Sequence, residues 1–268
     1  MNHPQIAAFA RLATENTPFL RSIEGQKSLL SRTMHDLAYD SIHDEIVVTG
    51  PLTQSILTFR GAANGEEAPV RVIQGSKTEI LGVGAVGKVS IDPKNNEILL
   101  ATPEQKILVF SRDSNGNVAP LRILGGPDTM LRLGEQRDGS GQSPPVRVDS
   151  VNDLLLVPSG GKMLIFDRTV SGNTKPRAVI VGPVRTGNQF EIYGPKRRLI
   201  THSRDMLEIW NIPDHGESTE PPVVRIPCPL GRASNDTGMV LDPVHKEIII
   251  ATAAGNTVMT FSVPEVFN

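Results

Sequence analysis

The sequence predicts an all-β fold, a β-propeller made of four-stranded antiparallel blades. Three observations predict it: a phrase repeated about every 50 residues, four short apolar segments in each repeat, and turn residues between the segments. The phrase is clearest at 110–126, FSRDSNGNVAPLRILGG. A single four-stranded unit cannot cover both of its faces, so repeats of this length are expected to stack around a ring.

An aromatic residue opens each copy of the phrase and sets the period. It recurs at spacings of 50, 51, 56, 44 and 51 residues. The regular spacing predicts one repeating domain over 1–268. The six aromatic positions are Phe9, Phe59, Phe110, Phe166, Trp210 and Phe261.

Two apolar segments precede each aromatic residue after the first, and each is four to six residues long. The first segment ends in Asp, and the second follows a short polar turn, as EILLAT does at 97–102. The aromatic run and the segment after the proline supply two more strands. Short β-rich segments between turn residues indicate hairpin-connected strands. The terminal residues of the first segment are Asp40, Asp92, Asp149, Gly194 (in place of Asp) and Asp242.

The ends of the chain decide how the ring closes. The inner pair of strands occurs five times, which favours five blades, with six as the alternative. We expect Phe19–Ile23 to supply the outer strand of the last blade, beside the strand that ends at Phe261, because this would remove an open sheet edge. The expected blades cover about 34–75, 83–125, 146–182, 188–228, and 237–262 with 18–24.

The units read V-x-D-x-x-x-x-E-I, then I-x-V-F-x-R, then N-G-N-x-x-P-x-R-x-I-x-G. This pattern resembles NHL-type propeller repeats, and in particular bacterial repeat proteins with an FxRxxxGNxxPxR phrase. The resemblance covers essentially the whole chain. It implies the propeller fold and no single function, since propellers serve many roles.

Two residue types recur in every unit or nearly so. The terminal Asp side chains are expected to accept hydrogen bonds from turn amides rather than to form a cation-binding ring. The arginines of the outer segment are expected to cover the edge of each blade. These arginines are Arg21, Arg71, Arg122 and Arg225, with Arg177 slightly out of phase.

The innermost strands should line a central channel, where propellers often bind ligands. Aligned on the terminal residue, the channel candidates combine one carboxylate with two cations, which favours an ionic network over a metal site. No metal or other cofactor is expected. The candidate ligand-binding residues at the channel mouth are His35, Asp36, Lys88, Arg147 and Phe190.

The repeat is interrupted most clearly at 126–145, where a polar insertion lengthens the spacing to 56. Long loops on a rigid scaffold often carry binding residues, although a neutral loop is an equal alternative. The candidates in this insertion are Arg132, Glu135, Arg137 and Asp138.

Bulk composition excludes several classes of protein. The formal charge of −2 lacks the basic excess of most nucleic-acid binders, and the single cysteine, Cys228, cannot form an intrachain disulfide. No apolar run reaches the length of a membrane span. The N-terminus does not read as a signal peptide, so a soluble cytoplasmic protein is the default and a secreted one follows if the N-terminus was trimmed.

These observations favour a non-catalytic propeller that binds a protein or a small-molecule ligand. The first alternative is a hydrolase or lactonase with a site at the channel mouth and a cation near Asp36. The lesser alternative is RNA binding, as in some NHL domains. No catalytic motif is present in the sequence, so the enzyme alternatives are disfavoured.

Overall fold

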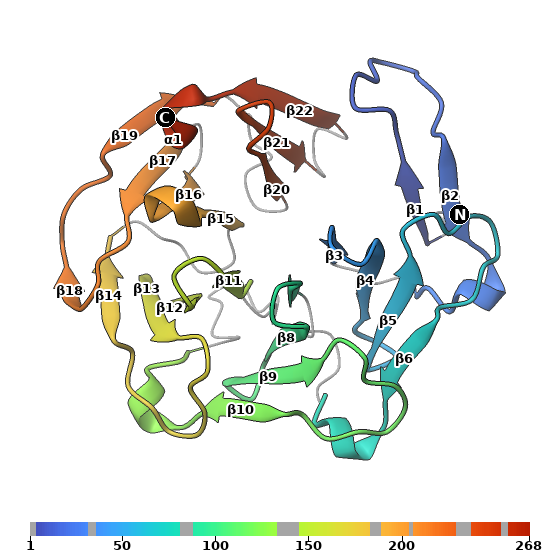
Figure 1. Ribbon diagram of the computed structural model, residues 1–268, viewed down its shortest axis with the longest axis horizontal. Coiled ribbons are helices and arrows are strands. Elements are labelled where there is room, and N and C mark those ends of the chain that lie inside the picture. The colour runs from blue at the N-terminus through green and yellow to red at the C-terminus, as the bar shows by residue number, and fades with distance from the viewer. Residues whose placement is uncertain are drawn as a thin grey trace.

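The computed structural model forms a ring of five small antiparallel sheets, the blades of a β-propeller (Figure 1). It describes residues 4–31, 36–80, 88–132, 145–182, 189–203, 206–228, 237–252 and 257–268. In each blade the first strand lies nearest the centre and later strands lie further out. The predicted five-bladed propeller is confirmed.

Hairpins join successive strands, so the order of strands in each sheet follows the chain. The first two blades are β3 (Leu37–Asp40), β4 (Glu45–Gly50), β5 (Ser55–Arg60) and β6 (Arg71–Gln74), then β7 (Val89–Asp92), β8 (Glu97–Thr102), β9 (Lys106–Ser111) and β10 (Arg122–Gly125). The third and fourth blades are β11 (Arg147–Asp149), β12 (Leu154–Ser159), β13 (Lys162–Asp167) and β14 (Ala178–Val181), then β15 (Phe190–Tyr193), β16 (Arg198–Ser203), β17 (Met206–Asn211) and β19 (Val224–Pro227). The fifth blade is β20 (Thr237–Asp242), β21 (Glu247–Thr252) and β22 (Thr257–Ser262).

Short helices follow several outer strands or close a turn. They are the 3₁₀ turns η1 (Gln26–Ser28), η2 (Ser76–Thr78), η3 (Pro127–Thr129) and η4 (Gly194–Lys196), and the α-helix α1 (Pro264–Phe267). Val266 and Phe267 of α1 are buried, and the Phe267 ring meets Tyr193 edge-on at 4.9 Å. The helix therefore anchors the C-terminal end against the fourth blade.

The N-terminal strands correct the predicted closure. β2 (Arg21–Glu24) pairs with β1 (Gln5–Ala8), and not with β22. The predicted pairing of Phe19–Ile23 with the strand ending at Phe261 is therefore wrong, because the local hairpin satisfies β2 instead. This N-terminal hairpin lies between the last and first blades (Figure 1), and Arg11 Nη1 reaches Glu247 Oε2 of the last blade at 2.9 Å.

The aromatic residues of the repeated phrase fill the core between blades. Phe59, Phe110 and Phe166 are fully buried, and Trp210 is nearly so. Each core cluster combines strands of neighbouring blades, as where Val109 of β9 packs with Phe166 of β13. The N-terminal copy differs, since Phe9 is exposed and its ring meets the Phe19 ring edge-on. Burial at the blade interfaces explains why stacking, rather than any single sheet, holds the ring together.

The Asn-Gly turn of the phrase binds the outer strand of the preceding blade. Gly116 donates its N–H to the Val72 carbonyl at 2.6 Å, and its own carbonyl accepts the Gln74 N–H at 3.1 Å. The Val72 N–H donates to Asn115 Oδ1 at 2.9 Å. We call this parallel bridge the inter-blade clasp. It recurs between Ile23 and Gly65, between Leu124 and Gly172, and between β14 and β18 (Gly216–Ser218).

The recurring Asp residues accept hydrogen bonds in the turn after the first strand, as predicted. Asp149 Oδ1, for example, accepts the N–H groups of Val151 and Asn152 at 3.0 and 3.1 Å. Asp40, Asp92 and Asp242 accept equivalent backbone bonds. In these four turns the carboxylate therefore replaces a missing backbone partner.

Two of the recurring outer-strand arginines, Arg71 and Arg122, bind glutamates at the blade interfaces, a role that the sequence analysis missed. Glu97 accepts Arg122 Nη2 of its own blade at 2.7 Å and Arg168 Nη1 of the next blade at 3.1 Å. Glu45 accepts Arg71 and Arg112 in the same arrangement. Burial opposes ionisation of Glu97, but the bonds and charges of the two arginines outweigh it and lower its pKa.

We expect Gly75→Ala to destabilise the protein more than Gly116→Ala. Gly116 has φ +79°, where an alanine costs about 1–2 kcal/mol. Gly75 has φ 128° and ψ 174°, a conformation that is essentially restricted to glycine. A Cβ at Gly75 would also lie 2.6 Å from the Asn117 side chain, whereas a Cβ at Gly116 meets nothing within 4 Å. Urea unfolding of both variants measures the difference, and equal losses would show that the contact with Asn117 does not matter.

We expect the stabilisation from Glu97 to disappear in acid. Its pKa is lowered in the folded chain, so the folded state binds fewer protons than the unfolded one and the stabilisation is complete above the unfolded value of about 4.3. Glu97→Gln should cost about 1–3 kcal/mol at pH 7 and progressively less below about pH 4. Denaturation at a series of pH values tests this; a difference that stays constant down to pH 3 would contradict it.

Candidate functional site

Strand pairing in the fourth blade shifts the predicted channel register by one residue. Tyr193 pairs with Arg198, just as Asp40 pairs with Glu45 in the first blade. The terminal position of β15 is therefore Tyr193 and not Gly194. Counting back from Tyr193, the channel positions are Glu191 and Gln189, both missed by the sequence analysis.

Phe190 consequently does not have the position predicted for it. Its side chain is 1% exposed and packs with Leu156, Ile165 and Leu199 in the core between the third and fourth blades. The error arose because Gly194 was aligned with the recurring Asp.

Arg147 and Glu191 form an ion pair between the inner strands β11 and β15. Arg147 Nε donates to Glu191 Oε1 at 3.0 Å, and Arg147 Nη2 donates to Gln189 Oε1 at 3.1 Å. Nη1 donates to the Val146 carbonyl at 3.0 Å, so each of the three guanidinium nitrogens donates one hydrogen bond. Arg147 thus forms an ion pair on the inner strands, and its partner is Glu191, which was not among the predicted channel residues.

Burial dominates the electrostatics of this pair. It raises the pKa of Glu191, and the nearby Asp36 charge adds to the rise while Arg147 opposes it. Burial works against the charge of Arg147, but Glu191 and Asp36 together raise the pKa of that guanidinium. Asp36 thus acts on both partners, as expected for a channel residue.

The other channel candidates have different outcomes. Lys88 is buried, with 7% of its surface exposed. His35 lies outside the described residues. The structure therefore brings Asp36 near Arg147, adds Glu191 and Gln189, and removes Phe190.

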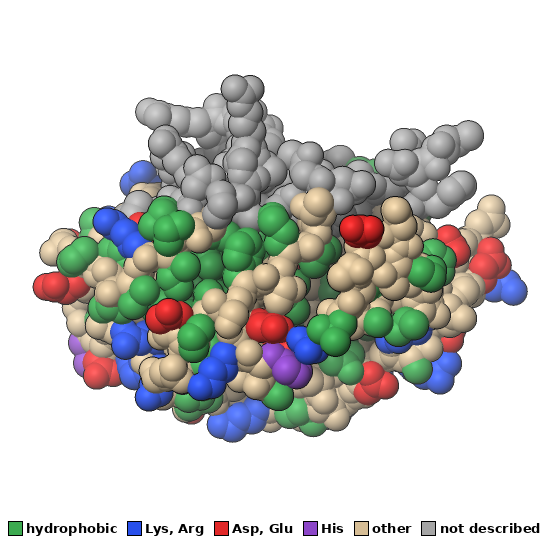
Figure 2. Space-filling model, turned by 90° about the horizontal axis from the view of Figure 1, so that it is seen from above, with side chains coloured by type: hydrophobic (Ala, Val, Ile, Leu, Met, Phe, Trp, Pro, Cys, Tyr) green, Lys and Arg blue, Asp and Glu red, His purple; other side chains and the backbone are tan. Residues whose placement is uncertain are grey.

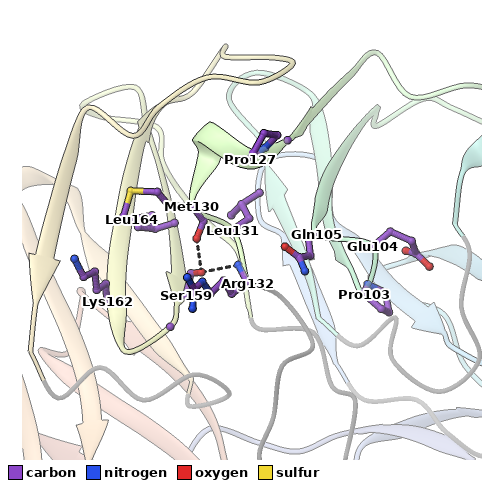
Figure 3. Close-up of a pocket in the computed structure, with 12 residues that line it drawn as sticks. Pro103, Glu104, Gln105, Pro127, Met130, Leu131, Arg132, Ser159, Lys162 and Leu164 are labelled. Carbon is purple, nitrogen blue, oxygen red and sulfur yellow. Dashed lines mark hydrogen bonds between the residues drawn. The ribbon is translucent and has the colours of Figure 1, made fainter.

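A groove of about 950 Å³ lies between the second and third blades (Figure 3). Its walls come from the β8–β9 turn at 103–105, the segment after η3, and the β12–β13 turn. The last turn consists of Gly160 and Gly161, both at positive φ. Two glycines allow a tight two-residue hairpin turn, which is shorter than the three-residue turn between β8 and β9.

The groove combines an apolar floor with cations. Leu131 and Leu164 are buried at its base, and Met130 lies beside them with 42% exposure. Arg132 and Lys162 bring two positive charges, and Glu104 of the β8–β9 turn brings one negative charge, so the cations are in excess by one. Lys162 Nζ also contacts Glu217 at 3.3 Å. Such a lining suits an anionic ligand with an apolar part.

Ser159 fixes the segment that carries Arg132. Its Oγ accepts the Arg132 N–H at 2.7 Å and donates to the Met130 carbonyl at 2.9 Å (Figure 3). The polar insertion thus contributes Arg132 to the lining of the groove. The other insertion candidates, Glu135, Arg137 and Asp138, lie outside the described residues.

One described group has ligand atoms close enough to hold a metal ion: Asp242, His245 and Glu247. Asp242 Oδ2 already contacts His245 Nδ1 at 2.7 Å within the repeated turn. Glu247 binds Arg11. These partners explain the cluster as part of the turn and the blade interface.

A scan against models of known protein families finds no match, and a search of curated proteins finds none with significant similarity. The resemblance to NHL-type repeats therefore depends on the repeated phrase alone. Among the described residues, no helix has the length and apolar character needed to cross a membrane.

We expect Arg147→Met to destabilise the protein and Arg147→Met/Glu191→Leu to recover most of the loss. Removing one partner leaves a buried carboxylate, which costs about 3 kcal/mol or less here because the two side chains keep 15% and 19% of their surface. The double variant replaces both charges with apolar groups of similar volume. Guanidinium unfolding at pH 7 measures both, and a double variant as unstable as Arg147→Met would contradict the ion-pair explanation.

Proposed function

We propose that this protein is a non-catalytic binding scaffold, and that the groove between the second and third blades takes its ligand. The ligand class is a molecule or acidic peptide with an apolar body and at least one anionic group. The observation that carries the proposal is the pairing of Arg132 and Lys162 with the apolar floor at Met130, Leu131 and Leu164.

Three features support a binding role for this groove. Its volume of about 950 Å³ falls within the range of ligand pockets in proteins, about 300–1,000 Å³. Its walls are turns of two stacked blades, which hold the lining residues on rigid strands. The Ser159 bonds fix the backbone beside Arg132, so less entropy is lost when a ligand binds.

The repeated phrase supports a second part of the proposal, that the scaffold is an NHL-like repeat protein. Its Asn-Gly turn, proline and outer-strand arginine recur in the order typical of that pattern. The partner class stays a protein or a small-molecule ligand.

The test uses 8-anilinonaphthalene-1-sulfonate, an apolar fluorescent anion, as the probe. We expect Arg132→Glu/Lys162→Glu to weaken its binding about tenfold or more, since two charge-assisted contacts become repulsive. Fluorescence titration at low salt measures the dissociation constant.

The matched control is Lys27→Glu/Lys77→Glu, which makes the same change in net charge at two exposed sites away from the groove. It should bind the probe as the parent protein does. An equal loss in both double variants would attribute the effect to net charge, and no loss in the groove variant would refute the proposed site.

A further inference from the structure

The fifth blade has an open edge. β20, β21 and β22 form a three-stranded sheet, and within the described parts of the chain β22 pairs only with β21. The corresponding strands of the first four blades each pair with an outer strand. Open edges of this kind are templates for strand addition.

The exposure of β22 differs sharply from that of its counterparts. Val258 is 69% exposed, whereas Ile56 and Ile107, at the same position of β5 and β9, are fully buried. Figure 2 views the molecule from above Figure 1, the side on which β22 lies, and it shows several hydrophobic side chains exposed on this side. Ile56 and Ile107 pack both with the outer strand of their own blade and with residues of the next blade. Val258 therefore marks an exposed apolar face of β22 beside the open edge, part of which a fourth strand would cover.

The N-terminal hairpin carries a turn in the conformation of the inter-blade clasp. Glu15 follows Phe9 by six residues, as Gly65 follows Phe59 and Gly116 follows Phe110. Its φ is +48°, in the same left-handed region as those glycines. The other clasps each bind the outer strand of the preceding blade, which for this turn is the fifth blade. The clasp conformation is therefore present beside the open edge, at a residue for which it is unfavourable.

Glu247 places a negative charge in the fifth blade at the position where the first two blades have Glu45 and Glu97. Glu45 and Glu97 each bind one arginine from the outer strand of their own blade and one from the next blade. Glu247 binds Arg11, the arginine of the next unit in the ring. Its side chain is 22% exposed, against 12% for Glu45 and 10% for Glu97. An incoming arginine would complete the same three-residue arrangement.

We propose that β22 binds an extended segment of a partner protein, which pairs antiparallel with it as a fourth strand. The other blades define the register and the sequence class. In the second blade Arg122 pairs with Val109 and Leu124 pairs with Ile107. The incoming segment therefore places an arginine opposite Thr260 and a leucine or isoleucine opposite Val258, in the pattern Arg-x-Leu/Ile.

Charge and connectivity favour a partner protein over a second copy of this chain. Glu15 and Glu247 both favour a basic segment. On the described strands, the chain's own segments of this pattern lie in β2, β6, β10 and β16, and each of these strands is already paired. A second copy would have to open its ring to donate one.

The test adds a fluorescein-labelled peptide with the sequence of residues 119–126, APLRILGG, to the full chain. We expect saturable binding by fluorescence anisotropy and slower amide hydrogen exchange at 258–261. Replacing the peptide arginine with alanine should weaken binding about tenfold, as expected for the loss of one charge-assisted pair. A scrambled peptide should not bind.

The protein variant Val258→Asp should abolish binding, and Val244→Asp is its matched control, because Val244 is 85% exposed in a turn away from the edge. The groove variant Arg132→Glu/Lys162→Glu should bind the peptide unchanged, which separates this site from the proposed ligand groove. Equal binding of the scrambled peptide, equal effects of the two Asp variants, or no binding at millimolar peptide would overturn the proposal. So would a dimer that already protects 258–261, since a second copy would then be the occupant.

Discussion

The ring depends on the inter-blade clasp, in which a turn at positive φ binds the outer strand of the preceding blade. Each sheet alone has an exposed outer edge, and its two faces need neighbours to bury them. The clasp covers part of the exposed outer edge, because Gly116 and its counterparts form hydrogen bonds with the middle of an outer strand. Apolar packing of Phe59, Phe110 and Phe166 buries the sheet faces. The hydrogen bonds of the clasp form in one register only. They therefore fix how far one blade can shift along its neighbour.

The Glu–Arg interactions reinforce the same interfaces by a different force. Glu97 joins an arginine of its own outer strand to one from the following blade, so its charge is shared across the interface. Each such glutamate is largely buried, and leaving it without arginines would be unfavourable. Blade stacking therefore depends on backbone geometry, apolar packing and charge at once. The clasp turn, the buried aromatic residue and the arginines all come from one 17-residue phrase, and the glutamate comes from the strand before it. This explains why the phrase is repeated so closely.

Much of this architecture could be predicted from the sequence, because strand length, turn residues and period are local properties. The Asp turns followed from side-chain chemistry in the same way. The clasp could not be predicted, since a parallel bridge between units leaves no mark on the periodicity of either one. The register predicted for the fourth blade was wrong for a specific reason. Tyr193 replaces the recurring Asp, and Gly194, the first residue of the Gly194–Lys196 turn, was aligned with that Asp one residue too late. That shift concealed Glu191 and Gln189.

The groove was only partly predictable, because it depends on two turns far apart in sequence. Arg132 was identified from the insertion, but its partner Lys162 belongs to an ordinary strand of the next blade. Arg132 and Lys162 line the same groove because blade stacking places β13 beside the β8–β9 turn.

The weakest joint of the ring lies between the fifth blade and the N-terminal hairpin. A two-stranded hairpin is marginal by itself. This hairpin is tied to the first blade by the Ile23–Gly65 bridge, by Arg21 Nη2 donating to the Gly61 carbonyl at 2.6 Å, and by the Ser22 N–H donating to Asn64. Towards the fifth blade it has the Arg11–Glu247 pair, between side chains that are 42% and 22% exposed, and such pairs contribute at most about 1 kcal/mol. The hairpin is therefore held by more bonds to the first blade than to the fifth, and the edge of β22 can be reached without breaking any clasp in the described structure.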